Sequence, residues 1–233
     1  MSGDPYMYRF GYSGRPLPGP TFGGMAEYSL TPLVVGVMQV NYARMAAEDL
    51  SEEELFPYYP GGALGGGIHR VGFSQDHGDW KIGQLLGGIG IREEEGRLSF
   101  NMRIEAGAQW TRSPAVEVNE HGTTWTNDDP FYGTYSTRTV QPSLEAWSVV
   151  AGGGIDLGLA LGPRIELRLG AALHTSSVGL PYTWKTAYNE QRNNGPDPYP
   201  GGYSRTTSIE VKQPVTAYLM TFGVTYRFPS GDQ

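Results

Sequence analysis

Several segments of the chain alternate strictly between apolar and polar positions. From Leu98 to Trp110 every second residue is apolar, and the residues between them are polar, charged or glycine. Successive side chains of a strand point to opposite faces of its sheet, so this period predicts a β-strand with one apolar face. Segment 80–91 is the least clear case, because apolar residues occupy both of its faces. The alternation recurs at 165–174, 147–159 and 218–228, and in shorter form at 6–12, 22–30 and 34–42.

Short and long connections between these segments alternate along the chain. Short joins fall at 30–33, 92–97 and 159–164, and long ones at about 46–77, 113–141 and 177–207. Outer-membrane barrels have short turns on one side, longer loops on the other and an even number of strands. We therefore predict one all-β domain over 1–233, an eight-stranded antiparallel up-and-down transmembrane β-barrel. Its strands are expected near 5–13, 20–30, 32–45, 78–91, 97–112, 142–158, 164–177 and 208–228.

Segment 62–74 also has a strand-like pattern. We interpret it as part of the first long connection, where it extends the sheet beyond the bilayer. A separate spanning strand at this place would require a further strand to keep the number even.

Two features predict which face of the barrel is inside. Aromatic residues lie towards the ends of the apolar faces, as in the interfacial girdles of membrane barrels. The polar faces carry isolated charges of both signs in nearly equal number, which suits pairing within a narrow interior. A water-soluble, lipocalin-like barrel with its apolar face inward is the alternative. The predicted interior charges are Arg9, Glu27, Lys81, Arg103, Glu105, Asp156, Glu166, Arg168 and Arg227.

Composition and charge narrow the possible functions. The chain has no cysteine, which excludes disulfides and thiolate sites. A formal net charge of −7 argues against a nucleic-acid partner. No apolar stretch is long enough for a membrane-spanning helix. The first residues lack a basic-then-apolar signal, so we expect any export signal to lie outside this numbering.

The residues resemble those of a known group of membrane proteins. Ala26–Pro32 (AEYSLTP) looks like a strand–turn–strand junction, and Tyr218–Phe228 ends in Tyr-Arg-Phe. With the alternating turns and loops, these features resemble the small outer-membrane β-barrel proteins of Gram-negative bacteria, which include opacity-like and OmpA-transmembrane-domain-like barrels. The resemblance implies a location in the bacterial outer membrane and an assembly signal at the last strand. The chain departs from that signature by continuing past Phe228 to Gln233.

One constellation invites comparison with an enzyme. His174-Thr175-Ser176, with Glu190 as an orienting acid, loosely resembles the His-x-Ser of lipid A deacylase barrels. The Asn-Ala that follows in that family is replaced by Ser177-Val178. We interpret His174 as a histidine at the barrel rim, and we expect no catalytic residues and no enzymatic activity.

Metal and cofactor sites are not predicted. His69, Asp76 and His77 lack the close spacing of a metal site. The Asn127–Asp129 run lacks the remaining ligands of a calcium loop. We expect no metal and no cofactor.

The long connections are rich in tyrosine and tryptophan among small polar residues. Tyrosine provides a large contact area at low entropic cost, which is typical of recognition surfaces. The alternative is that these rings pack the loops against one another. The contact candidates are Tyr58, Tyr59, Trp125, Tyr132, Tyr182 and Trp184.

These features together predict a structural or surface-interaction role through the external loops. The expected partners are outer-membrane lipid and a protein or ligand at the loops. A narrow channel for small or apolar solutes is the first alternative, although an eight-stranded interior is just wide enough for side chains to fill it. A lipid-modifying enzyme is the second.

Overall fold

The computed structural model describes residues 17–47, 66–126, 133–192 and 203–226. These ranges form β-strands that pair antiparallel throughout, and none of their residues form a helix able to cross a membrane. The strands are β1 (Thr21–Ser29), β2 (Val34–Ala46), β3 (Gly66–His77), β4 (Asp79–Glu95), β5 (Leu98–Arg112), β6 (Val116–Thr126), β7 (Gly133–Gln141), β8 (Glu145–Ala160), β9 (Ile165–Arg192) and β10 (Tyr203–Tyr226).

In three places one strand continues into the next after a joint of one to three residues. β3 leads into β4 through Gly78, β5 into β6 through 113–115, and β7 into β8 through 142–144. The sheet continues across these joints, because the Gly78 amide donates to the Ala115 carbonyl at 2.9 Å and the Ser113 amide to the Leu144 carbonyl at 2.8 Å. The described part of the 62–74 segment therefore belongs to β3, which extends the line of β4 as predicted.

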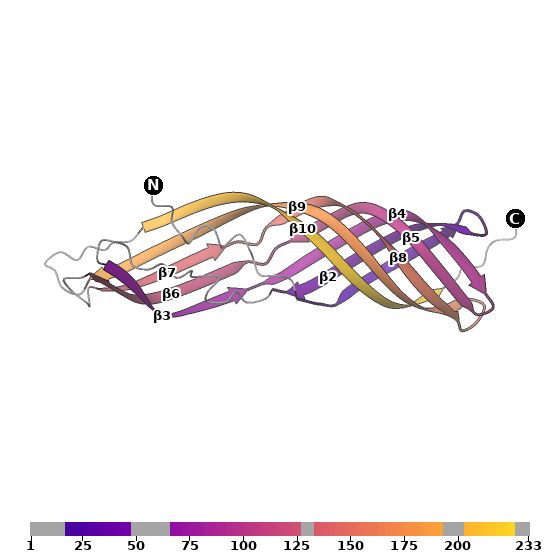
Figure 1. The fold of residues 1–233 in the computed structure, drawn as a ribbon, viewed down its shortest axis with the longest axis horizontal. Coiled ribbons are helices and arrows are strands. Elements are labelled where there is room, and N and C mark those ends of the chain that lie inside the picture. Colours follow the sequence, from indigo (N-terminus) through magenta and orange to yellow (C-terminus); the bar gives the residue numbers. More distant parts are fainter. Residues whose placement is uncertain (1–16, 48–65, 127–132, 193–202, 227–233) are drawn as a thin grey trace.

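The sheet is curled, and its two halves share β9 and β10 (Figure 1). In one half the strand order is β1-β2-β4-β5-β8-β9, with β10 on the other side of β9. In the other half β9 pairs with β7, and β6 and β3 follow. β9 pairs with β8 through Glu166–Ser176 and with β7 through Lys185–Arg192. The result is a long, half-barrel sheet.

The predicted strands from 20 to 158 match the structure within a few residues. β1, β2, β4, β5 and β8 occupy them, while the predicted 164–177 and 208–228 strands are parts of the longer β9 and β10. The 5–13 strand lies outside the described residues. The prediction that 113–141 and 177–207 are loops is wrong for their described parts, which form β6, β7 and the outer ends of β9 and β10.

The faces of the sheet have the polarity expected of a membrane barrel. On the outer face Ile104 is 66% exposed and Met220 is 87% exposed. On the inner face Arg103 is 3% exposed and Glu166 is fully buried. In this part of the sheet large apolar side chains thus face outward and charged side chains are enclosed, which is the reverse of the arrangement in a water-soluble barrel.

Candidate functional site

Glu27 connects strands from opposite sides of the interior. It accepts hydrogen bonds from Arg168 Nη1 at 2.6 Å and Nη2 at 3.0 Å, from Arg92 Nη1 at 2.9 Å and from Asn101 Nδ2 at 2.6 Å. In the sheet, β1 and β9 are separated by β2, β4, β5 and β8. The direct contact between Glu27 on β1 and Arg168 on β9 therefore shows that the sheet curls far enough for its walls to meet inside.

Glu166 completes this ionic cluster. Its carboxylate accepts from Arg92 Nη2 at 2.9 Å, from Ser99 Oγ at 2.8 Å and from Arg168 Nε at 3.3 Å. Two enclosed glutamates thus face two arginines, and Arg92 Nε also lies 2.8 Å from Oε1 of the exposed Glu94. Burying charges is costly unless they are paired and hydrogen-bonded, and this arrangement supplies both requirements.

A second cluster lies farther along the same strands. Arg103 donates through Nε to Glu105 Oε1 at 2.8 Å and through Nη1 to Asp156 Oδ2. His174 Nε2 is 3.4 Å from the same Glu105 oxygen. Each of these four side chains is at most 3% exposed.

Side-chain amides extend the hydrogen-bond network from His174 of the second cluster to further residues of the interior. Gln84 accepts from Asn41 Nδ2 at 3.3 Å and donates through Nε2 to Gln109 Oε1 at 2.9 Å. Gln84 Oε1 is also 3.1 Å from His174 Nδ1. Gln109 Nε2 in turn donates to Ser176 Oγ at 2.8 Å. Polar side chains therefore fill this stretch of the interior and hold one another in place.

Glycines on the inner face provide the room for these side chains. A Cβ at Gly158 would lie 2.0 Å from Glu166 Oε1 and 2.1 Å from Ser99 Oγ. A Cβ at Gly170 would lie 2.0 Å from Asp156 Oδ1. The many glycines of β8 and β9 are thus explained at these two positions by carboxylates that occupy the space of a side chain.

The structure places the predicted interior charges as follows. Glu27, Arg103, Glu105, Asp156, Glu166 and Arg168 lie on the inner face, and Arg9 and Arg227 fall outside the described residues. Lys81 was predicted inside, but it is partly exposed on the outer face. Its neighbours Trp80 and Ile82 take the inner positions, so the apolar pattern of this strand misled the prediction.

Sequence reasoning missed Arg92, which joins Glu27 to Glu166. The prediction ended the strand at residue 91 and assigned Arg92 to a turn. β4 in fact continues to Glu95. Alternate residues of a strand share a face, so Arg92, eight positions after the inward Gln84, belongs to the inner face, and the sequence could have indicated this.

The histidine–serine constellation does not form a catalytic triad. His174 was predicted at the rim, but it is 1% exposed in the interior, because β9 continues far beyond it. Ser176 Oγ contacts Gln109, not the histidine. Glu190 lies farther along β9, about 50 Å from His174 at roughly 3.3 Å per residue. Within the described ranges no three His, Cys, Asp or Glu side chains form a metal-binding group.

The outer face changes character along the strands. Its apolar band on β5 runs from Leu98 to Trp110 and on β8 from Leu159 to Trp147. The next outward positions are Arg112 and Glu145. On β6 and β7, beyond this boundary, most of the described outward residues are polar, including Asn119, His121, Ser136 and Arg138.

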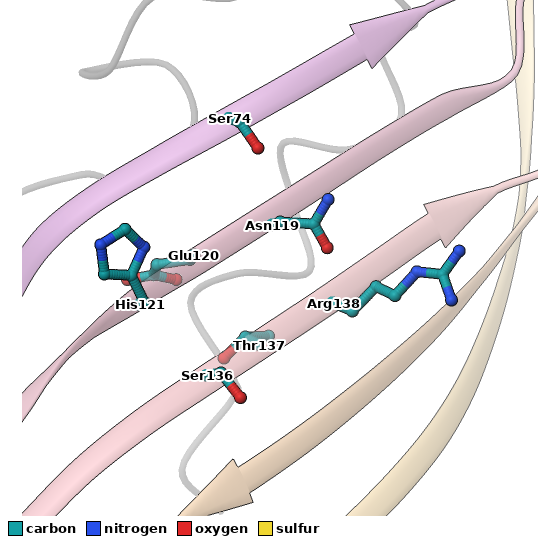
Figure 2. A pocket seen from close by; sticks show the side chains of 7 residues that line it. All are labelled: Ser74, Asn119, Glu120, His121, Ser136, Thr137 and Arg138. Carbon is teal, nitrogen blue, oxygen red and sulfur yellow. The ribbon is translucent and has the colours of Figure 1, made fainter.

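A hollow of about 300 Å³ lies over this polar part of the sheet. Figure 2 shows its side chains, which come from β3, β6 and β7. Arg138 donates to both oxygens of Glu117, at 3.0 and 2.8 Å, and Asn119 donates to one of them at 3.0 Å. The Arg138 hydrogen bonds, followed by that of Asn119, hold the pKa of Glu117 below its usual range. The lining residues are Ser74, Asn119, Glu120, His121, Ser136, Thr137 and Arg138.

The predicted contact aromatics divide into two groups. Trp125 lies on β6, and Tyr182 and Trp184 lie on β9. These three residues were predicted in loops, so that part of the prediction is wrong. Tyr58, Tyr59 and Tyr132 fall outside the described residues.

No family model matches this chain, and no curated protein matches it.

Proposed function

We propose that this chain is a closed, eight-stranded outer-membrane-type β-barrel of bacterial origin. We propose for it a non-enzymatic role in structure or surface interaction. The observation that carries the proposal is the polarity of the curled sheet, in which Glu27, Arg92 and Arg168 meet across the interior while apolar residues face outward.

An aqueous environment does not suit this arrangement. A soluble domain gains stability by removing apolar surface from water, but this sheet leaves many large aliphatic and aromatic side chains outside. A hydrocarbon surrounding accommodates these side chains. It also requires every backbone polar group to find a partner within the protein, as sheet pairing allows.

The dimensions of the apolar band agree with a bilayer. Leu98 to Trp110 span about 40 Å along β5 at roughly 3.3 Å per residue. A strand tilt of about 45° reduces this length to a height of about 28 Å, close to the roughly 25 Å apolar band of outer-membrane barrels.

Segment 5–13 would close the barrel. In the described structure β1 and β10 each have one partner, β2 and β9 respectively, so each presents a second edge. A strand between them would satisfy both edges, which is necessary in lipid. With the joined strands counted once, it would also bring the number to eight, an even number as such barrels require.

Membrane folding is tested by refolding the purified chain with and without detergent. We expect it to refold only in detergent or lipid, and to migrate differently on a gel before and after heating. A chain that is monomeric and folded in detergent-free buffer, with no heat-dependent change in migration, would contradict the proposal.

The part of the sheet beyond the apolar band supports the surface role. β3, β6, β7 and the outer ends of β9 and β10 continue the sheet beyond the proposed bilayer-spanning part, and polar side chains such as Asn119, His121, Ser136 and Arg138 lie on the outer face of β6 and β7. Removal of the β6–β7 hairpin (116–141) should leave a heat-modifiable barrel. We expect cells that carry the full chain to adhere to one another, and cells that carry the shortened chain not to do so. Equal adhesion of both would contradict the role.

The alternatives receive less support. Interlocked side chains fill the described interior from Glu27 to Gln109, so a conducting path is not favoured. Stable single-channel currents in a planar bilayer would favour the channel instead. Glu190 lies too far from His174 to orient it, so the residues that suggested a lipid-modifying enzyme do not support that function.

A further inference from the structure

Strand register aligns aromatic residues at the outer limit of the apolar band. Tyr42 is opposite Gly83, Gly83 is opposite Trp110, and Trp110 is opposite Trp147. This aromatic row (Tyr42, Trp110, Trp147) therefore crosses β2, β4, β5 and β8 at directly opposite positions of the sheet. Trp110 Nε1 donates to Glu145 Oε2 at 3.4 Å, which turns the polar edge of the indole away from the band. Aromatic rings with a polar edge are typical of a membrane interface.

Basic residues form a second row directly beyond the first. Arg44 is opposite Lys81, and Lys81 is opposite Arg112. These three residues, the basic row, occupy the next outward position on β2, β4 and β5. Neighbouring strands are about 4.8 Å apart, so three positive charges lie within about 10 Å across the sheet. Like charges directly opposite one another destabilise a sheet.

The acidic neighbours neutralise only the two ends of the basic row. Arg44 pairs with Asp79. Arg112 Nε lies 3.7 Å from Glu145 Oε1 and donates to Ser143 Oγ at 2.7 Å. Within the described part of the chain no carboxylate forms an ion pair with Lys81, in the middle of the row. The row therefore carries an excess positive charge at its centre.

We propose that the basic row binds the phosphate of an anionic lipid head group, with the acyl chains of that lipid against the aromatic row. The proposal rests on the membrane insertion argued above. Gly83 places no side chain between Tyr42 and Trp110, and a Cβ there would lie 3.5 Å from Trp110 Cε3. The Trp110 indole therefore packs over Gly83, and an acyl chain would lie against this ring directly below Lys81. The adjoining apolar surface favours a lipid over a soluble phosphate.

The test measures which lipid lies next to the tryptophans. The chain is inserted into vesicles of phosphatidylcholine and phosphatidylglycerol, one of which carries brominated acyl chains that quench tryptophan fluorescence. Trp125 and Trp184 are changed to Phe, so that Trp110 and Trp147 dominate the lipid-dependent signal. We expect brominated phosphatidylglycerol to quench several-fold more effectively than brominated phosphatidylcholine at equal content.

Substitutions locate the effect. Lys81→Gln should lower the preference for phosphatidylglycerol about fivefold, as expected for one cation near an anionic surface. Arg97→Gln is the matched control, because Arg97 is an exposed cation at the turn between β4 and β5, near the opposite end of the apolar band. This control should leave the preference unchanged.

Each contrary result has a distinct meaning. Equal quenching by both lipids, or an equal effect of Lys81→Gln and Arg97→Gln, overturns the lipid site and leaves the barrel intact. Displacement of the phosphatidylglycerol preference by inorganic phosphate overturns the assignment to a lipid. Failure of the chain to insert into any vesicle overturns both this site and the proposed function.

Discussion

At the residue scale, Glu27 is the central acceptor of the ionic cluster that it forms with Arg92, Glu166 and Arg168. Replacement by Gln removes its charge and leaves Glu166 as the one enclosed carboxylate shared by Arg168 and Arg92, with the exposed Glu94 as a further partner of Arg92. We expect Glu27→Gln to lower the free energy of unfolding by about 3 kcal/mol, because removing one partner of a buried ion pair leaves an uncompensated charge. Urea titration in lipid vesicles measures this change.

Glu93→Gln is the control for that substitution. Glu93 is an exposed glutamate on β4, next to Arg92 in sequence but on the outer face. Its replacement should change the free energy of unfolding by less than about 0.5 kcal/mol. Equal effects at Glu27 and Glu93 would show that the interior pairs contribute no more than surface charges.

Gly158 tests the packing of the same cluster. Gly158→Ala places a Cβ where Glu166 Oε1 and Ser99 Oγ now lie, so the carboxylate must move away from its arginines. We expect a loss of about 1–3 kcal/mol in the free energy of unfolding, the usual range for overpacking. Gly87→Ala is the comparison, because a Cβ there meets no atom within 4 Å. Similar unfolding curves for the two variants would rule out steric pressure on Glu166.

The interior charges show where residue-level prediction from the sequence succeeds, and Lys81 shows where it fails. Around Arg103, Glu166 and Arg168, one face is uniformly apolar, so the charges are assigned to the other face by elimination. On β4 both faces carry apolar residues, because Trp80, Ile82 and Leu86 pack inside above the polar network. The pattern there has no unique phase, and the charge at residue 81 was assigned to the wrong side.

At the scale of the strand, β5 offers a test of depth in the apolar band. Ile104 lies midway between Leu98 and Trp110 on the same face, and Leu98 lies at the end of the band. We expect Ile104→Arg to lower the free energy of unfolding in lipid by about 2–4 kcal/mol, and Leu98→Arg by at most about 1 kcal/mol. The two variants carry the same new side chain, so only depth distinguishes them.

The same two variants should have small and similar effects on stability if the band faces water. An exposed arginine would then change stability little at either position, since exposed substitutions usually stay within about 0.5 kcal/mol. The measurement is urea unfolding in vesicles, with folding followed by tryptophan fluorescence. Equal changes in the free energy of unfolding for Ile104→Arg and Leu98→Arg would contradict the insertion of this band into a bilayer.

The elements that sequence reasoning missed share one physical property. On β6 the outward residues Glu117, Asn119 and His121 are polar, as is Glu120 on the inner face. Outside a bilayer neither face of a strand needs to be apolar, so the alternation that identified β5 weakens in its continuation. The pairing of β6 with β3 and β7 comes from long-range register, which a single segment does not reveal.

At the scale of the whole molecule, the central issue is closure. The contact between Glu27 on β1 and Arg168 on β9 brings one wall of the half-barrel against the other. β10 pairs with β9 along its full length, so the second edges of β1 and β10 border the same gap. In lipid, unpaired backbone groups along both edges would each be unfavourable by several kcal/mol. The strand that alternation predicts at 5–13 is our proposed occupant of this gap.

Engineered disulfides provide the last prediction, because the chain has no cysteine of its own. Tyr8→Cys is combined in turn with a cysteine at Tyr218, Met220, Phe222 or Val224, the outward positions of β10. If 5–13 pairs with β10, one of these combinations brings the two Cβ atoms within about 3.5–4.5 Å, and a disulfide forms on oxidation in vesicles. Tyr8→Cys with Ile104→Cys is the control, since β5 lies away from the gap in the strand order and should give no disulfide. Inserted chains that form no disulfide with any β10 position would indicate an open sheet, with 5–13 elsewhere.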